Sequence, residues 1–394
     1  MLLDNMSRLK RERSNSSRPN KGHKKPRLSG FSSTKDDEDL FESESVGSDS
    51  GDTREDGEYS MSELPPLTRA LYLIQTGRVH EADHLIAELG CTHRLAECIL
   101  RYDLPNQSTN ESQATSPSSH NQSGRGAHRK YMFACDEALP PEMLQVMKSA
   151  FSSKDSVFWE AHSYSVSPPS PYFSYVHDLS QKSAHGLDDV VRHAQRVAAK
   201  GFPNVMNATF AEWWVHCRPH NSGHQFHFDS ADEGRGGVRN PIASTVLYLE
   251  AACGGPTCVT DQKFGEPKLG EEGWLAHPKE NRFVAFDGRV LHGVVPGRGF
   301  QMLLSARRVT FMVAFWEHDV RQEHNSGDPP GSAMPLPLEA EWMQPLLPRL
   351  SSDKNPIVRE VEPHRLPRVW ERVGKAGKGL GSRMPSYSQC FQGF

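Results

Sequence analysis

The sequence predicts an α+β fold in which a few helices precede a barrel or sandwich of short strands. Between residues 210 and 316, short apolar runs bounded by Gly, Pro and Asn recur, which is typical of strands. Residues 141–151 and 187–199 instead carry apolar side chains at helical spacing. Many short strands favour a closed arrangement, because closure removes exposed sheet edges.

Composition indicates that only part of the 394 residues forms a core. The hydrophobic fraction is 36%, and the chain holds 28 prolines and 31 glycines, so tails and linkers are expected. The formal net charge of -4 makes no general case for nucleic acid or a membrane as partner. The seven cysteines are scattered and form no C-x-x-C pair, so neither a disulfide framework nor a zinc ribbon is predicted.

Residues 1–63 are predicted to form a disordered charged tail. Residues 1–30 hold nine Lys or Arg against two acidic residues, and residues 31–63 hold twelve acidic residues against two basic ones. Neither half has the apolar residues to fold. Residues 21–27 (KGHKKPR) resemble a nuclear-import signal, and the acidic serines resemble phosphorylation sites, although a solvated tail explains both equally well. Without an apolar stretch of signal-peptide or membrane-spanning length, we expect an intracellular location, in the nucleus or cytoplasm.

Residues 64–103 are predicted to form a small helical segment. Apolar residues recur at helical spacing before Gly77 and again before Gly90, and a third short helix is expected over residues 94–101. The stretch ALYLIQTGRVHEADHLIAEL resembles one tetratricopeptide hairpin, but such arrays need about three units, which favours an accessory bundle. Residues 104–130 are polar and low in complexity, and they predict a flexible linker.

The principal domain is predicted over residues 131–318. Its strands are expected at residues 210–218, 224–228, 243–250, 257–261, 282–287, 289–295 and 308–316. Residues 319–394 are expected to form a Pro-rich, irregular C-terminal extension with one helix over residues 338–346.

Three side chains of this domain suggest a metal site. His227 and Asp229 are two residues apart on a predicted strand, so both side chains lie on one face. A further histidine, His292, lies in the apolar run GRVLHGVV, which predicts another strand of the same region. Two imidazoles and one carboxylate suit ferrous iron, because three ligands on one face leave the other coordination positions open.

These residues resemble the Fe(II)/2-oxoglutarate dioxygenases, whose pattern is His-x-Asp, a distal His and then a basic residue. Within that superfamily, PHNSGHQFHFD, STVLYLEAACGGPT and NRFVAFDGRVLHGVVP are similar to segments of the prolyl 4-hydroxylase-like group, in the same order, and the resemblance covers residues 131–318. It implies a double-stranded β-helix (jelly-roll, cupin-like) with flanking helices. It also implies Fe(II) as cofactor, 2-oxoglutarate and O2 as co-substrates, and ascorbate as a support of activity.

Binding of 2-oxoglutarate requires a cation, since its distal carboxylate would otherwise be buried without a partner. Arg308 is the first candidate, and Thr310 lies on the same face of the predicted strand, so the pair offers a guanidinium and a hydroxyl. Arg307 would face the other way, and Arg298 lies in a turn; they rank second and third. No catalytic residue beyond the metal ligands is expected.

Neighbouring residues are assigned less specific roles. His216, His220 and His224 do not match a ligand position, and surface or loop roles are expected for them. Trp213 and Trp214 are expected to pack in the core rather than to line the co-substrate pocket. Relatives often carry a tyrosine near the position of His216 or Cys217, so a second contact to 2-oxoglutarate stays unassigned. Residues 230–240 suggest either a lid or a merely flexible loop.

The leading hypothesis is a hydroxylase that acts on a protein side chain, such as proline, with a protein or peptide as partner. A nucleic-acid oxidative demethylase is not favoured, because the Arg-x5-Arg spacing of AlkB-type enzymes is not found after His292. A non-catalytic jelly-roll binding module is the third alternative. The oligomeric state stays open.

Overall fold

The computed structural model describes residues 64–104, 131–152, 156–166, 169–170, 172–231, 238–266, 269–299, 306–321, 332–351, 355–374 and 385–394. The predicted tail over residues 1–63 lies outside these residues, as does the predicted linker apart from its first residue. Residues Pro65–Phe394 form one compact unit by their internal contacts.

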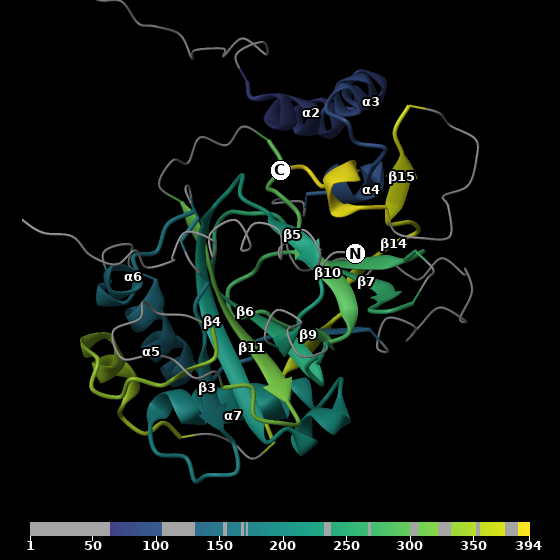
Figure 1. The fold of residues 1–394 in the computed structure, drawn as a ribbon. Coiled ribbons are helices and arrows are strands. Elements are labelled where there is room, and N and C mark those ends of the chain that lie inside the picture. The colour runs from purple at the N-terminus through teal and green to yellow at the C-terminus, as the bar shows by residue number, and fades with distance from the viewer. Residues whose placement is uncertain are drawn as a thin grey trace, which may run out of the picture. The chain divides into compact units, whose positions relative to one another are not determined.

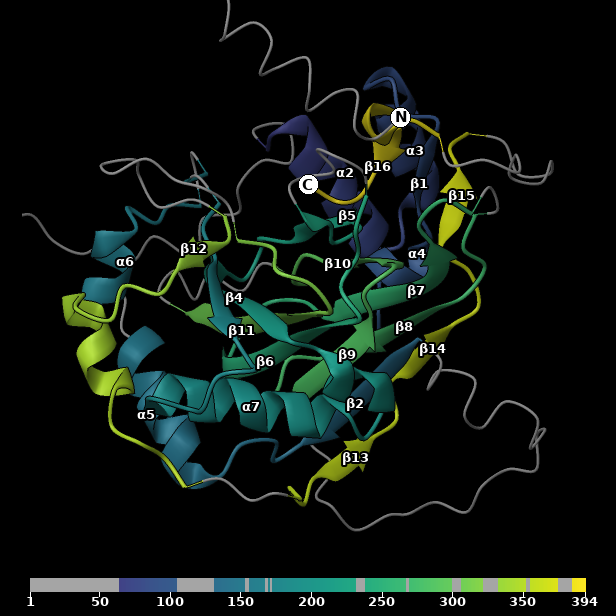
Figure 2. The same cartoon turned by 60° about the horizontal axis from the view of Figure 1, so that its bottom comes forward.

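The larger sheet has eight strands in the order β12-β3-β4-β11-β6-β9-β2-β13. Its central strands are labelled in Figure 1, and β12, β2 and β13 in Figure 2. Four antiparallel strands form its centre: β4 (Phe210–Pro219), β11 (Arg307–Trp316), β6 (Ala243–Ala251) and β9 (Phe283–Asp287). The flanking strands are β3 (Tyr175–Asp178), β12 (Met334–Pro335), β2 (Met132–Asp136) and β13 (Arg359–Val361). The predicted strands at residues 210–218, 243–250, 282–287 and 308–316 therefore form the centre of one sheet.

The smaller sheet has five strands in the order β14-β8-β7-β10-β5. Its members are β5 (His224–His227), β7 (Thr257–Lys263), β8 (Gly273–Ala276), β10 (Val290–Val294) and β14 (His364–Leu366). A buried cluster unites side chains of both sheets, among them Tyr248 of β6, Met312 of β11, Val259 of β7 and Val290 of β10. The two sheets therefore face one another across a shared interior.

Helices cover the other side of the larger sheet (Figure 2). They are α5 (Pro141–Phe151), α6 (Val157–Ala161) and α7 (Gly186–Ala198), and the first and last match the predicted helices to within one residue at each end. The His185 side chain caps α7 by accepting from the backbone amide of Asp188. Apolar faces of α5 and α7 pack on the outward-facing side chains of β4 and β11. None of the helices in the described ranges is long and apolar enough to cross a membrane.

The predicted N-terminal helical segment is joined to the end of the described chain. It contains α2 (Pro66–Gln75), α3 (Val79–Glu88), β1 (His93–Leu95) and α4 (Glu97–Leu100). Strand β1 pairs with β15 (Trp370–Arg372) and with β16 (Cys390–Phe391). The short helix expected over residues 94–101 is confirmed only over Glu97–Leu100, because pairing with residues distant in sequence fixes the first part of that range as a strand.

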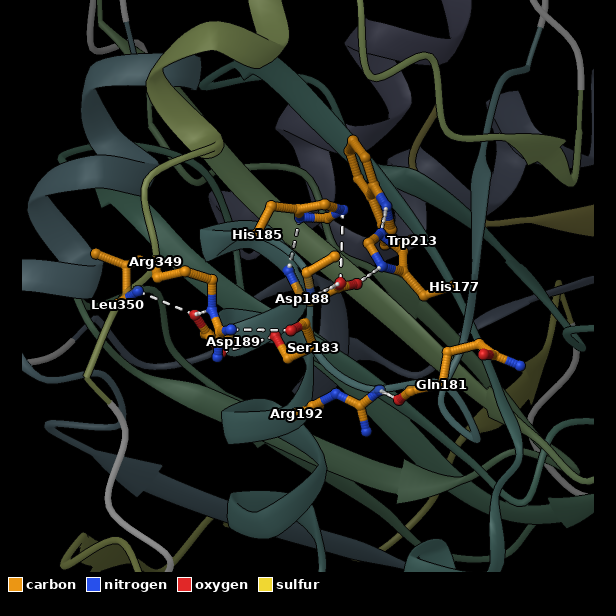
Figure 3. A network of polar contacts seen from close by, with 11 residues as sticks. His177, Gln181, Ser183, His185, Asp188, Asp189, Arg192, Trp213, Arg349 and Leu350 are labelled. Carbon is orange, nitrogen blue, oxygen red and sulfur yellow. Dashed lines mark hydrogen bonds and ion pairs between the residues drawn. The ribbon is translucent and has the colours of Figure 1, made fainter.

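The C-terminal extension is more ordered than the sequence predicts. Strands β12, β13 and β14 each add to an edge of one of the two sheets. The helix expected over residues 338–346 is a 3-10 helix over Glu341–Leu346 with Pro345 inside it, and proline cannot supply the amide that a longer α-helix needs. Arg349 and the amide of Leu350 bind the carboxylate of Asp189 in α7 (Figure 3). The boundaries predicted at residues 103 and 318 thus do not separate compact units.

Candidate metal centre

His227, Asp229 and His292 converge at the interior face of the smaller sheet. Strands β5 and β10 are antiparallel neighbours, and their register sets His227 directly opposite His292, with ring centroids 4.3 Å apart. Oδ1 of Asp229 lies 3.3 Å from Nε2 of His227 and 3.6 Å from Nε2 of His292. All three side chains offer a ligand atom within 4.8 Å of the others. The three residues singled out in the sequence therefore form one cluster.

Hydrogen bonds orient each of these side chains. Nδ1 of His227 lies 2.7 Å from the carbonyl of Gln225, and Nδ1 of His292 lies 3.1 Å from the carbonyl of Val290. A ring that donates from Nδ1 to a carbonyl keeps a lone pair on Nε2, the nitrogen that faces Asp229. The hydroxyl of Ser244 donates to Oδ2 of Asp229 at 2.5 Å, so Oδ1 is directed at the two imidazoles.

The charges of the cluster suit a cation. Burial lowers the pKa of His292 to about 4, although the Asp229 carboxylate opposes this change. For Asp229, burial by itself raises the pKa, but the two histidines and the Ser244 hydroxyl outweigh it and the pKa is lowered. For His227, burial lowers the pKa, but the hydrogen bond and the charge of Asp229 together with the Gln225 carbonyl outweigh burial and raise it. Near neutral pH the cluster thus holds an anionic carboxylate beside the neutral imidazole of His292, and His227, whose pKa is raised, would release its proton to bind a metal.

Two imidazole nitrogens and one carboxylate oxygen are the ligand set of non-haem Fe(II) sites, and a catalytic Zn(II) can use a similar set. The side chains of the larger sheet that face the cluster distinguish an Fe(II) site from a Zn(II) site. Successive side chains of strand β11 point to opposite faces of the larger sheet. Val309, Phe311 and Val313 pack under the helices, whereas Met312 joins the core between the sheets. Arg308 and Thr310 are on the same side as Met312 and so face the interior.

Arg308 is a buried cation without an acidic partner in the described part of the chain. Its side chain is only 3% exposed, and Nη1 donates to the carbonyl of Gly255 at 3.0 Å. Burial lowers the pKa of its guanidinium. Since an unpaired buried charge is costly, the site favours an anionic ligand there. Thr310, also buried, lies in register with His216 of β4 and Tyr248 of β6.

Two glycines make room for this guanidinium and for the turn around it. Gly254 has φ +93°, and a Cβ at this position would lie 2.8 Å from Nη1 of Arg308. A Cβ on Gly255 would lie 2.0 Å from the carbonyl oxygen of Val295. Gly254 is thus favoured by its left-handed backbone beside the Arg308 side chain, and Gly255 is required by close approach of other backbone atoms.

The lower-ranked arginines have other contacts. Arg307 lies on the opposite face of β11, where it lines a surface hollow with Lys148 and Glu280. Arg298 binds the backbone carbonyls of Arg101 and Tyr102, and so ties its turn to the helical segment. Neither lies on the interior face that carries Arg308.

The surface or loop role expected for His216 and His224 is wrong. The ring centroid of His224 lies 4.8 Å from that of His227 and 5.4 Å from that of His216. The register of β4 with β11 turns His216 inward beside Thr310, and burial holds the pKa of both rings well below the usual range. His220 does lie in a turn, where Nδ1 accepts from the amide of Gly254 at 3.0 Å.

Tyr164 is a neighbour of the site that the sequence did not indicate. Its hydroxyl accepts from the amide of Cys217 at 3.2 Å and lies 3.4 Å from Nδ1 of His216. A tyrosine therefore lies near His216 and Cys217 of β4, where the resemblance leads one to expect it. It comes from the segment after α6 and not from β4 itself. Trp213 packs in the core as expected, whereas Trp214 is half-buried on the interior face of β4 and meets Tyr172 edge-on at 5.9 Å.

A second cluster with metal-ligand chemistry, His177, His185 and Asp188, is a structural network (Figure 3). The indole Nε1 of Trp213 donates to Nε2 of His177 at 2.8 Å. An indole can only donate, so a neutral His177 must carry its proton on Nδ1, the nitrogen that contacts the Asp188 carboxylate. If a metal bound Nδ1, the neutral ring of His177 would carry its proton on Nε2. Two N–H groups, that of the ring and that of the Trp213 indole, would then face each other without an acceptor. The cluster therefore does not fit a metal ion.

No protein-family model matches the sequence, and no curated protein matches it. Solved structures are similar to part of the chain. A Pseudomonas putida prolyl-4-hydroxylase has 15% identity and a TM-score of 0.32, covering 48% of this chain and 89% of its own. The viral collagen prolyl hydroxylase of Paramecium Bursaria Chlorella virus-1, in complex with 2-oxoglutarate, has 16% identity and a TM-score of 0.28, covering 47% and 95%. SnoK, a non-haem α-ketoglutarate-dependent carbocyclase from nogalamycin biosynthesis, has 10% identity and a TM-score of 0.36, covering 58% and 98%.

Proposed function

We propose that this chain is an Fe(II)- and 2-oxoglutarate-dependent dioxygenase. One observation carries the proposal: two imidazoles and a carboxylate converge in the same interior that holds a buried arginine without an acidic partner among the described residues. A zinc hydrolase would need the three ligands but not the arginine, whereas an oxygenase with a dicarboxylate co-substrate needs both.

The strand order supports the double-stranded β-helix as the fold class. From β4 to β11 the chain alternates between the two sheets except at β7 and β8, which are antiparallel neighbours in the smaller one; β4, β6, β9 and β11 belong to the larger sheet and β5, β7, β8 and β10 to the smaller. Antiparallel strands that alternate between facing sheets are what a jelly-roll requires. The ligand strands β5 and β10 are then adjacent in one sheet, and the arginine strand β11 belongs to the other.

Each side chain has a role in this proposal. His227 and His292 would hold the metal through Nε2 and Asp229 through Oδ1, with Ser244 fixing the carboxylate. Arg308 would bind the distal carboxylate of 2-oxoglutarate, and the buried Thr310 hydroxyl would add a hydrogen bond. Bound Fe(II) would supply the redox chemistry, in which one atom of O2 becomes a substrate hydroxyl and the other enters succinate as CO2 is lost. No general base is assigned.

A protein side chain, such as proline, is the substrate class we propose. The motifs shared with the prolyl 4-hydroxylase-like group support it. So does Tyr172, which is 45% exposed and packs edge-on against Trp214 at the interior face of β4. Such an aromatic pair offers an apolar surface to a ring held near the metal.

Succinate production tests the oxygenase assignment. The purified chain with Fe(II), ascorbate and 2-oxoglutarate should form succinate even without a substrate, and His227→Ala should abolish it. The matched control is His364→Ala, because His364 is exposed on β14 and far from the proposed chemistry. Equal rates for the unaltered chain and His227→Ala would reject the proposal.

A peptide library separates the substrate hypotheses. Proline-containing peptides should gain the mass of one oxygen atom in a 2-oxoglutarate-dependent manner. Methylated oligonucleotides, run in parallel, should stay unchanged. Loss of methyl groups from the oligonucleotides, with no oxidised peptide, would favour the nucleic-acid demethylase instead.

A further inference from the structure

We infer that Arg218 is a second guanidinium for the distal carboxylate of the co-substrate, so that this carboxylate lies between Arg308 and Arg218. The inference rests on the proposed function and deepens it. It assigns the second contact to 2-oxoglutarate, which the sequence motifs leave open. The assignment comes from the pairing of strands β4 and β11.

The register of the larger sheet brings the two arginines together. Arg308 of β11 is directly opposite Arg218 of β4, and residues so paired in antiparallel strands have Cα atoms about 4.5–5.5 Å apart. Directly opposed residues point to the same face of a sheet. Arg218 therefore shares the interior face with Arg308, and its charge contributes to the lowered pKa of Arg308, in which burial is the larger cause.

Two like charges in this position require an anion. Opposed like charges on neighbouring strands are destabilising, and burial of Arg308 strengthens the repulsion. Nη1 of Arg218 donates to the hydroxyl of Ser222 at 3.3 Å, while its buried Nε has no hydrogen-bond partner among the described residues. Neither guanidinium has an ion pair with a described carboxylate. The pair thus holds two positive charges and at least one unused donor.

The groups around the pair are neutral hydrogen-bonding partners. The Tyr164 hydroxyl lies close enough that both arginines act on its pKa, which burial raises. The His216 ring is kept neutral by burial, with both arginines adding to the lowered pKa. Thr310 lies next to His216 in register. These surroundings select a ligand end that is anionic and accepts several hydrogen bonds, which a carboxylate does and an alkyl chain does not.

The structure therefore predicts a strong preference for 2-oxo acids with a distal carboxylate. The sharpest comparison is 2-oxoglutarate against 2-oxopentanoate, which has the same carbon chain but a methyl group in place of that carboxylate. Affinities of both can be measured without turnover, by anaerobic titration of the Fe(II)-loaded chain while the visible metal-to-ligand charge-transfer band is followed.

Replacing Arg218 should affect only one of these two ligands. Arg218→Met should weaken 2-oxoglutarate roughly tenfold to a hundredfold, because a hydrogen-bonded charge pair is lost, while 2-oxopentanoate stays within about twofold. Arg218→Lys should recover part of the loss. The control is Arg307→Met, one residue away on the opposite face of β11, which should leave both affinities unchanged.

The outcomes separate this inference from the proposed function. If the unaltered chain gives no charge-transfer band with either acid, both fail. If it gives the band, and neither Arg218→Met nor Arg218→Lys changes the ratio of the two affinities, only the role of Arg218 is rejected. Thermal unfolding of each variant shows whether it folds; should Arg218→Met be unfolded, the ratio in Arg218→Lys decides.

Discussion

The hydroxyl of Ser244 donates a hydrogen bond of 2.5 Å to the carboxylate of Asp229, so the two carboxylate oxygens have different partners. Oδ2 accepts from the hydroxyl, and Oδ1 faces both imidazoles. Ser244 belongs to β6 of the larger sheet, so the two sheets cooperate in fixing one ligand. Such supporting contacts orient a ligand and set its affinity for metal.

Ser244→Ala should therefore weaken Fe(II) binding by about 10–100-fold, the usual cost of losing a supporting contact, without unfolding the chain. Anaerobic titration with Fe(II), or with Co(II) as a spectroscopic substitute, measures the effect. Ser149→Ala, at an exposed position of α5, serves as the control. Unchanged affinity in Ser244→Ala would mean that the carboxylate is held without the hydroxyl.

Gly254→Ala should weaken 2-oxoglutarate binding, because its Cβ would lie 2.8 Å from Nη1 of Arg308 and displace that guanidinium. Gly265→Ala is a matched control: its φ is +80° against +93° at Gly254, but nothing lies within 4 Å of the added Cβ. Both variants should lose about 1–2 kcal/mol of stability from the left-handed backbone. Only Gly254→Ala should also bind 2-oxoglutarate at least about tenfold more weakly. Equal binding by the two variants would contradict the role given to this glycine.

Gln392 should stabilise the strand that carries His227. Its Oε1 accepts from the amide of Phe226 at 2.7 Å, and its side chain is 2% exposed. Gln392→Met would leave that buried amide without a partner, so the free energy of unfolding should fall by about 1–3 kcal/mol. Fe(II) affinity should fall with it, because β5 is an edge strand held on this side by Gln392. Gln389→Met, at an exposed position, should behave like the unaltered chain in denaturant unfolding and Fe(II) titration.

Asp188 should make stability depend on acid pH. Burial alone raises the pKa of its carboxyl, but the hydrogen bond and charge of His177 outweigh burial and lower the pKa to about 2. The pKa of Asp188 in the folded chain lies below the unfolded value of about 3.9, so its ionised carboxyl stabilises the folded chain at pH values above about 3.9. This contribution is lost as the pH falls toward 2.

The free-energy difference between the unaltered chain and Asp188→Asn should thus be constant above about pH 5 and shrink as the pH drops through 4 toward 2. Denaturant unfolding at several pH values measures it. Asp103→Asn, at an exposed position, should give no such trend. A difference for Asp188→Asn that did not change with pH would show that its carboxyl is not paired in the folded chain.

Local pattern was enough to predict the central strands, whereas the cluster of His227, Asp229 and His292 was predicted from spacing together with the resemblance of the motifs. β4, β6 and β11 are long apolar runs. The prediction that His227 and Asp229 share one strand was wrong, because β5 ends at His227 and Asp229 follows outside the strand. Short strands escaped prediction, among them Gly273–Ala276 of β8 and Arg359–Val361 of β13. Runs this short have no detectable period, so only pairing defines them.

Residues that reach the site from distant segments could not be predicted. Tyr164 follows α6, and Gln392 lies far from Phe226 in sequence, yet both contact the strands that carry the site. No local spacing relates such partners, because their contact exists only after the sheets have packed. The inward direction of His216 likewise depended on the register of β4 with β11.

Strands β13 (residues 359–361) and β14 (residues 364–366) pair with β2 and β8, which would otherwise be edge strands. A shortened polypeptide that stops at residue 318 would expose the backbone of β2 and β8, and would leave Phe226 without its side-chain acceptor. Unpaired backbone of this kind is a template for self-association. Recombinant fragments designed around the oxygenase motifs alone should therefore precipitate, and production of soluble material requires the residues that follow them.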